Sequence, residues 1–304
     1  MNALVISGGG SKGAFAGGVA EYLMKVKGRQ YDLYVGTSTG SLLIPSLAAG
    51  QLERVKQVYT TVKANQIFSV SPFIVHKKKG EYVVRMHHLN IIRMFLKGRK
   101  TFGSSRALHK LIKKTFTEED YQKIKADNKE IVVTVSNLTK HRVEYQSTND
   151  NSYRQFCNWI WASANLLPFM SLYRKNGMDY GDGGFGNLIP IQEAINRGAC
   201  NIDVIVLRPE KRLKENPPIR NAFNVLTRTY DFMMDQIGID DLAIGRLAAA
   251  KDKVNIDFYF TPRILTEQSF IFDPDQMKEW WKEGFEIFQN PGEPQPIHEI
   301  IQPK

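Results

Sequence analysis

A serine between two glycines is the feature of this sequence best suited to covalent chemistry. Gly36-Thr37-Ser38-Thr39-Gly40 fits the pattern GxSxG and lies between a predicted strand over 32–35 and a predicted helix over 41–49. In this setting the serine stands at the apex of a sharp strand-to-helix turn, where the flanking glycines allow close backbone approach. The start of the helix favours a developing negative charge. The pattern predicts an activated nucleophile at Ser38, and the alternative is an ordinary tight turn.

A nucleophilic serine needs a base, and the histidines of this chain are poorly placed to supply one. The usual order in hydrolases of this kind is Ser, then Asp or Glu, then His. Of the six histidines, only His298 lies far downstream, in a segment that we expect to be a tail. Asp182 instead lies on a glycine turn, with Gly181 before it and Gly183 and Gly184 after it. We therefore expect a carboxylate that acts directly on the serine.

A second glycine turn, Gly8-Gly9-Gly10-Ser11-Lys12-Gly13, follows the predicted strand 4–7 and precedes the predicted helix 14–25. This turn also fits GxGxxG, the dinucleotide-binding pattern, which requires an acid at the end of the next strand. Asp32 opens that strand instead. The turn is not a Walker loop, because Lys12 precedes the glycine and the spacing is too short. A nucleotide-dependent enzyme is thus a less favoured alternative.

Taken together, these segments resemble a known family. GGGSKG near the N-terminus, GTSTG some 25 residues later and DGG well downstream are similar to the patatin-like phospholipases, whose pattern is GGGx[KR]G, GxSxG and DG[GA]. Trp161-Ala162-Ser163-Ala164 with Pro168, and Asn187 with Pro190, also look familial. The resemblance covers about residues 1–208, and neither the basic segment described below nor the region after 208 contributes to it.

The resemblance implies a serine lipid acyl hydrolase of the phospholipase A or lysophospholipase type. Ser38 would attack a lipid ester and Asp182 would act as general base, giving an acyl-enzyme that water then hydrolyses. Backbone N–H groups of the first glycine turn would hold the oxyanion, and Lys12 would add charge there or bind a lipid phosphate. No cofactor or metal is implied. The expected oxyanion-hole residues are Gly8, Gly9, Gly10, Ser11, Lys12 and Gly13; the nucleophile turn contributes Gly36, Thr37, Thr39 and Gly40, and the base turn Gly183 and Gly184.

The elements that must position these residues alternate along the chain. Strand, glycine turn and helix occur twice in the first 50 residues, which predicts parallel neighbours with helices on both faces of the sheet. We expect a three-layer α/β/α sandwich with a central, mostly parallel sheet, in one domain over 1–290 with a tail over 291–304. Further strands are predicted at 130–138, 142–147, 178–180, 201–207 and 255–261. Further helices are predicted at 105–116, 153–164, 191–197, as a long pair over 220–251, and at 274–289.

The positive charge of the chain is concentrated in one segment. The formal net charge is +10, and residues 76–114 carry twelve Lys or Arg against one acid. We expect a basic helical insertion over about 67–117 whose partner is anionic. The apolar run 67–75 leads directly into a cluster of lysines, as in an interfacial membrane anchor. The predicted membrane contacts are Phe73, Lys77, Lys78 and Lys79.

Composition restricts the remaining alternatives. No apolar run reaches the roughly 20 residues that span a bilayer, and the N-terminus lacks the pattern of a signal peptide. We expect a cytoplasmic protein that binds membranes peripherally. The two cysteines predict neither a disulfide framework nor a zinc site. A non-catalytic adaptor that binds nucleic acid or membrane through the basic segment is a competing hypothesis, disfavoured because an adaptor needs no nucleophile, and nucleic acid is the less favoured ligand.

Overall fold

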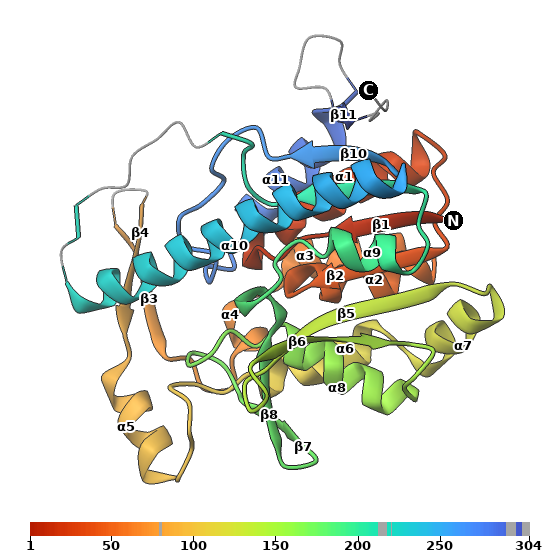
Figure 1. Ribbon diagram of the computed structural model, residues 1–304. Helices are drawn as coiled ribbons and strands as arrows, with labels where there is room; N and C mark the ends of the chain where they lie inside the picture. Colours follow the sequence, from red (N-terminus) through yellow and green to blue (C-terminus); the bar gives the residue numbers. More distant parts are fainter. Residues whose placement is uncertain (79–80, 212–217, 220, 290–295, 300–304) are drawn as a thin grey trace.

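A mixed sheet runs through the centre of the protein (Figure 1). The computed structural model describes residues 1–78, 81–211, 218–219, 221–289 and 296–299. Within these residues the strand order is β11-β10-β9-β1-β2-β5-β8-β7, with β6 paired to β5. The strands are β1 (Asn2–Ile6), β2 (Leu33–Thr37), β5 (Glu130–Asn137), β6 (Arg142–Ser147), β7 (Tyr173–Lys175), β8 (Met178–Asp182), β9 (Asn201–Val206), β10 (Asn255–Phe260) and β11 (Ile297–Glu299). The consecutive strands β10, β9, β1, β2 and β5 are parallel, as predicted.

Helices cover both faces of this sheet, because the buried strands present apolar side chains on each side. One face packs against α1 (Gly13–Lys25), α2 (Thr39–Ala48), α3 (Leu52–Thr61), α8 (Tyr153–Ser163) and α11 (Pro274–Glu286). The other face packs against α9 (Ile191–Asn196) and the second half of α10 (Ala222–Asp252), which crosses the front of Figure 1. The remaining helices are α4 (Ala64–Ile67), α5 (His88–Leu96), α6 (Arg106–Thr115), α7 (Glu118–Ala126), η1 (Gly10–Lys12) and η2 (Gly183–Phe185). The predicted three-layer architecture is confirmed.

Strand β5 brings together the turn that carries Ser38 and the turn that carries Asp182. One edge of β5 pairs with β6 over 132–137. The other edge pairs first with β2, up to Thr37 opposite Thr134, and then with β8, where Asp182 is opposite Val135. Because β2 is parallel to β5 and β8 is antiparallel, β2 and β8 lie end to end with their C-terminal ends facing each other. Ser38 and Asp182 therefore meet at the junction.

Three predictions about secondary structure are wrong. The basic segment is not wholly helical, because β3 (Phe73–Lys78) and β4 (Glu81–Met86) form an antiparallel hairpin. The predicted pair of helices after 220 is the single helix α10. Gly238 and Gly245 do not interrupt it, since both are buried where the helix packs closely on Leu188 and Ile191. The predicted tail contains strand β11, which pairs antiparallel with β10.

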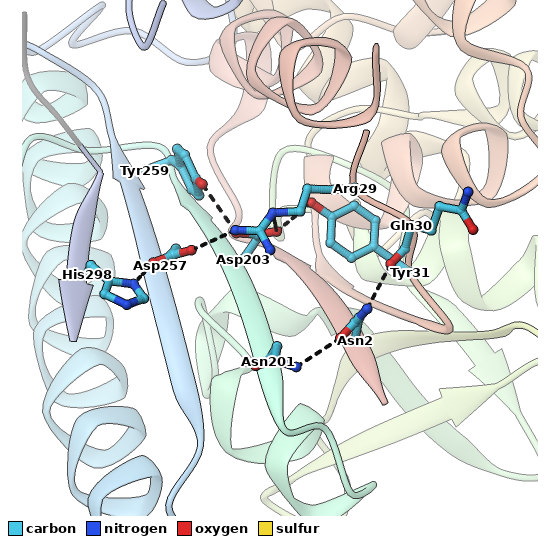
Figure 2. A network of polar contacts seen from close by, with 9 residues as sticks. All are labelled: Asn2, Arg29, Gln30, Tyr31, Asn201, Asp203, Asp257, Tyr259 and His298. Atoms are coloured by element: carbon cyan, nitrogen blue, oxygen red, sulfur yellow. Dashed lines mark hydrogen bonds and ion pairs between the residues drawn. The ribbon is translucent and has the colours of Figure 1, made fainter. Parts of the chain in front are cut away.

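A polar network fastens this last strand and the loop before β2 to the sheet (Figure 2). The buried carboxylate of Asp203 on β9 accepts hydrogen bonds from Tyr31 at 2.7 Å and Tyr259 at 3.2 Å. Arg29 lies 3.7 Å from Asp203 and donates to Asp257 on β10 at 3.1 Å. Asp257 also contacts the ring of His298 on β11. His298 is thus held on an edge strand, in a structural network.

Candidate active site

The backbone at Ser38 has the conformation of a sharp turn. Ser38 is the N-cap of α2 and adopts φ 54° and ψ −117°, a strained combination for a residue with a side chain. Two glycines make the turn possible. A Cβ at Gly36 would lie 2.6 Å from the Gly40 carbonyl carbon, and one at Gly40 would lie 2.1 Å from the Ile6 oxygen. The predicted strand, turn and helix around Ser38 are confirmed.

Asp182 is the hydrogen-bond partner of the Ser38 hydroxyl. Ser38 Oγ donates to Asp182 Oδ2 at 2.7 Å, and Asp182 Oδ1 accepts the N–H of Gly184 at 2.8 Å. The aspartate is only 3% exposed. Burial raises the pKa of Asp182 to about 7, and the hydrogen bonds from Ser38 and Gly184 offset part of this rise. A carboxyl with this pKa can take up and release a proton near neutral pH.

The first glycine turn lies directly beside Ser38. A Cβ at Gly8 would lie 3.3 Å from the Cβ of Ser38. Gly8 N–H donates to the Leu188 oxygen at 3.1 Å and Ser11 N–H to the Ser269 oxygen at 3.0 Å. The N–H groups of Gly9 and Gly10 have no hydrogen-bond acceptor within the described residues, and both glycines line the cavity that contains Ser38.

The turn over residues 8–13 offers fewer N–H donors than the sequence predicts. The N–H of Ser11 is already used, and the N–H groups of Lys12 and Gly13 are directed to carbonyls within the turn, Lys12 to Gly9 at 3.3 Å. The side chain of Lys12 lines the cavity. Gly10 adopts φ 60°, and a Cβ there would lie 2.4 Å from the Ser269 oxygen, so the turn needs glycine at this position. Two N–H groups of the turn remain available.

The neighbours of Ser38 and Asp182 in the two motifs have positioning roles. Thr37 Oγ1 donates to the Asn187 oxygen at 3.1 Å. Thr39 Oγ1 lies 2.8 Å from the hydroxyl of the buried Tyr59 on α3. A Cβ at Gly183 would lie 2.3 Å from the Thr134 oxygen, so the base turn can approach β5 only with glycine there. These contacts hold the two turns in place, and Thr39 and Tyr59 also line the cavity that contains Ser38.

A cavity of about 260 Å³ opens over Ser38 and Asp182. Its apolar wall comes from several helices and from the loop before α11. The wall includes Leu42, Val55, Val58, Leu108, Leu111, Ile112, Phe169, Met170, Tyr230, Met234, Phe270 and Phe272. Arg208 and Asp235 are among the polar residues of the lining, and Arg208 donates to the backbone carbonyl of Asp235 at 2.9 Å. The cavity suits a mainly apolar molecule with a polar group at Ser38.

Comparison with known proteins decides the family. The sequence model described as "Patatin-like phospholipase" matches residues 4–195, more than half of the chain. The chain belongs to the patatin-like phospholipase family. Its similarity to the uncharacterized protein YjjU of Escherichia coli (strain K12) is 23% identity over 218 residues, 69% of this chain and 52% of YjjU. The chain thus spans about half the length of this curated relative. The crystal structure of VipD from Legionella pneumophila aligns with a TM-score of 0.47 and 14% identity, covering 94% of this chain and 65% of that chain.

Two residues of this patatin-like chain support the site in ways that the sequence analysis missed. Ser163 on α8 accepts the N–H of Ser38 at 3.0 Å, and its Oγ lies 2.9 Å from that of Ser41. Asp241 on α10 accepts the N–H groups of Leu188 and Ile189 at 2.6 and 2.9 Å, and so holds the segment that binds Gly8. Ser163 lies in a motif already singled out. Asp241 lies within a helix 59 positions after Asp182, and no local pattern marks it.

Of the four predicted membrane contacts, Phe73 is placed differently from the expectation. Phe73 is buried in a cluster with Phe68, Phe169, Phe223 and Phe270, so it is a core residue and does not reach the surface. Lys77 is exposed and its Nζ lies 5.2 Å from the centre of the Tyr82 ring. Lys78 belongs to β3, and Lys79 lies outside the described residues.

The described residues offer neither a membrane-spanning helix nor a metal-binding cluster. No helix in this part of the chain is long and apolar enough to cross a membrane. No group of three or more His, Cys, Asp or Glu in the described ranges is arranged to hold a metal ion.

Proposed function

We propose that this protein hydrolyses carboxylic esters of lipids, of the phospholipase A or lysophospholipase type, through an acyl-enzyme on Ser38. The observation that carries the proposal is the 2.7 Å hydrogen bond from Ser38 to the buried Asp182, on a strained turn at the base of an apolar cavity. The family supports lipid acyl hydrolysis in general. The serine and the aspartate together supply a nucleophile and a base without a histidine.

In the first step, Ser38 Oγ attacks the ester carbonyl while Asp182 Oδ2 accepts the hydroxyl proton. The hydrogen bond already directs this proton to the carboxylate. Ordinary aspartate is a weak base, but burial raises the pKa of Asp182 to about 7, which strengthens it. The protonated Asp182 then returns the proton to the leaving alcohol, and the acyl group remains on Ser38.

The negative oxygen of the tetrahedral intermediate would be held by the N–H groups of Gly9 and Gly10. These donors are directed by the turn, and neither is used by another acceptor in the described part of the chain. Donors fixed in advance stabilise the charge without reorganisation, and loss of one typically lowers the rate by about 10²–10³-fold. In the second step, Asp182 takes a proton from water, which attacks the acyl carbonyl. The bond from the acyl carbon to Ser38 Oγ then breaks, the fatty acid leaves, and Asp182 returns the proton to Ser38 Oγ.

Apolar side chains around the cavity suit the acyl chain of the lipid. Lys12 lines the same cavity beside the proposed oxyanion site, and it would add positive charge there or contact a lipid phosphate. The proposed partner is a lipid at an anionic membrane surface, consistent with the basic segment. A cytoplasmic location stays a prediction from the sequence.

Labelling with a fluorophosphonate probe tests the proposal directly. We expect the probe to modify Ser38 alone, because this serine has both a base and unused N–H donors beside it. Mass spectrometry of the digested, labelled protein identifies the site, and released fatty acid from defined lipid vesicles identifies the reaction. Ser46→Ala is the matched control and should be labelled like the parent, since Ser46 lies on the same helix α2 but is buried and does not line the cavity. Persistent labelling of Ser38→Ala protein would contradict the proposal.

The pH dependence should follow the ionisation of Asp182. Only the ionised carboxylate accepts the serine proton, and burial raises its pKa to about 7. We therefore expect kcat/KM for a soluble ester to rise about tenfold per pH unit below pH 7 and to level off above it. Rates measured across this pH range in buffers of constant ionic strength give the midpoint of the profile, which reports the pKa of the base. A flat profile between about pH 5 and 8 would rule out Asp182 as the base.

A further inference from the structure

Helix α5 presents an apolar surface to solvent. Leu89, Ile92, Phe95 and Leu96 are all exposed, and Leu89, Ile92 and Leu96 recur at helical spacing along one side. The opposite side attaches the helix to the protein through the buried Met94. Figure 1 shows α5 at the periphery, below the hairpin and away from the sheet. Exposed apolar side chains that form one stripe mark an interaction surface.

Positive charge surrounds this stripe. Residues 82–100 contain five Lys or Arg and no Asp or Glu. These five side chains are Arg85, Arg93, Lys97, Arg99 and Lys100, all exposed. None of them forms an ion pair with an acid in the described ranges, although Lys100 acts electrostatically on Asp179. An apolar stripe bordered by cations is complementary to an anionic lipid surface, where the headgroups are negative and the layer beneath them is apolar.

The position of α5 connects it to the cavity. The ring of Phe95 lies 6.0 Å from that of Phe102, and Phe102 lies 6.1 Å from Phe169. Phe169 lines the cavity that contains Ser38. The helix is further held by Asn90 Nδ2, which donates to the Ser71 oxygen at 2.9 Å. The stripe is therefore attached to the cavity wall through packed side chains.

We propose that α5 docks the protein on an anionic phospholipid bilayer, with Leu89, Ile92 and Leu96 entering the interfacial layer and Arg93 and Lys97 contacting the headgroups. This inference rests on the proposed function in one respect: docking through α5 would bring lipid esters to the cavity. The exposed apolar residues of the second half of α10 lack the charge for this role, since residues 239–252 contain three acids and two bases.

Sedimentation with vesicles tests the docking separately from catalysis. All binding is measured on Ser38→Ala protein, which cannot form the acyl-enzyme, with vesicles of phosphatidylcholine alone or mixed with phosphatidylglycerol. Ile92→Ser/Leu96→Ser removes side chains that are 53% and 84% exposed. The matched control, Ile244→Ser/Leu247→Ser on α10, removes side chains that are 52% and 72% exposed. Equal thermal midpoints establish that all variants are folded.

We expect Ile92→Ser/Leu96→Ser to bind mixed vesicles at least about tenfold more weakly than the parent, because each apolar side chain that enters the bilayer contributes to interfacial binding. Arg93→Glu/Lys97→Glu should reduce binding of mixed vesicles to that of phosphatidylcholine alone. The α10 control should stay within about twofold of the parent, since its residues do not enter the bilayer. Equal binding by the parent and both α5 variants would overturn the proposal. So would a dimer of the parent that Ile92→Ser/Leu96→Ser abolishes, because the stripe would then join two copies of the chain.

The same substitutions in protein that retains Ser38 distinguish the docking proposal from the proposed function. Hydrolysis of a soluble short-chain ester should be unchanged in every α5 variant, and hydrolysis of vesicle lipid should fall in parallel with binding. If the binding pattern holds and no ester is cleaved, the docking surface stands and the proposed function is wrong. If esters are cleaved and the α5 variants bind vesicles like the parent, the docking surface is wrong.

Discussion

Asp182→Asn is expected to lower kcat/KM for a soluble short-chain ester by at least about 1,000-fold. The amide has the shape of the carboxyl and retains the contact with Gly184, but it cannot accept the proton of Ser38. Binding of the ester should change little, so the loss should fall mainly on kcat. Steady-state kinetics with a chromogenic ester measure both constants. Residual activity within tenfold of the parent would exclude Asp182 as the base.

His298→Ala is the control for this result. His298 lies on the edge strand β11, four strand positions from β2, or about 19 Å across the sheet. It contacts Asp257 in the polar network of Figure 2 and does not line the cavity. We expect kcat/KM to change by less than about threefold. A loss as large as that of Asp182→Asn would favour a triad with histidine.

Gly40→Ala is expected to lower the free energy of unfolding by about 3 kcal/mol or more. The added Cβ would lie 2.1 Å from the Ile6 oxygen. Ile6 ends β1, a strand paired on both sides, by β2 and by β9. Neither the strand nor the turn can move away without breaking these pairs. Urea unfolding followed by circular dichroism measures the change, and a failure to accumulate folded protein agrees with the prediction.

Gly28→Ala provides a contrasting substitution. Gly28 has a positive φ, 64°, which Gly40 does not have, and nothing lies within 4 Å of the position of its Cβ. We expect the free energy of unfolding to fall by about 1 kcal/mol, because alanine is strained in this left-handed backbone conformation. Gly28→Ala therefore measures the cost of a left-handed backbone without a close contact, and Gly40→Ala measures the cost of a close contact in a helical backbone. Equal unfolding midpoints would show that the contact between the nucleophile turn and β1 is not tight.

The sequence was sufficient to predict those parts of the site that depend on local patterns. An apolar run before GTSTG and a helix after it define the turn at Ser38 within 20 residues. The glycine neighbours of Asp182 and the family resemblance predict it as the base, and the structure places it beside Ser38. The parallel arrangement of β1, β2, β5, β9 and β10 followed from the alternation of strands and helices. Each of these inferences needs only short-range periodicity and turn chemistry.

Features that depend on contacts between distant segments could not be predicted. Phe73 lies in an apolar run beside lysines, a pattern that fits a membrane anchor equally well, and only its packing on Phe169 and Phe223 places it in the core. The strand around His298 exists because β10 offers a free edge. Asp241 has a role only because α10 passes the backbone of Leu188. Burial of Asp182, which raises its pKa, likewise depends on the whole fold.

The end-to-end pairing of β2 and β8 on β5 determines where this chain can change in length. Ser38 and Asp182 are 144 residues apart, yet their separation in space is set by the neighbouring residues Thr134 and Val135. Loops of the long intervening segment that contact neither side chain, such as the turn between β5 and β6, can gain or lose residues without altering it. One extra residue between Thr134 and Val135 would move the two strand ends apart by about 3.3 Å. The site therefore depends on chain length at the peptide bond between Thr134 and Val135, which is remote from both reacting side chains in sequence.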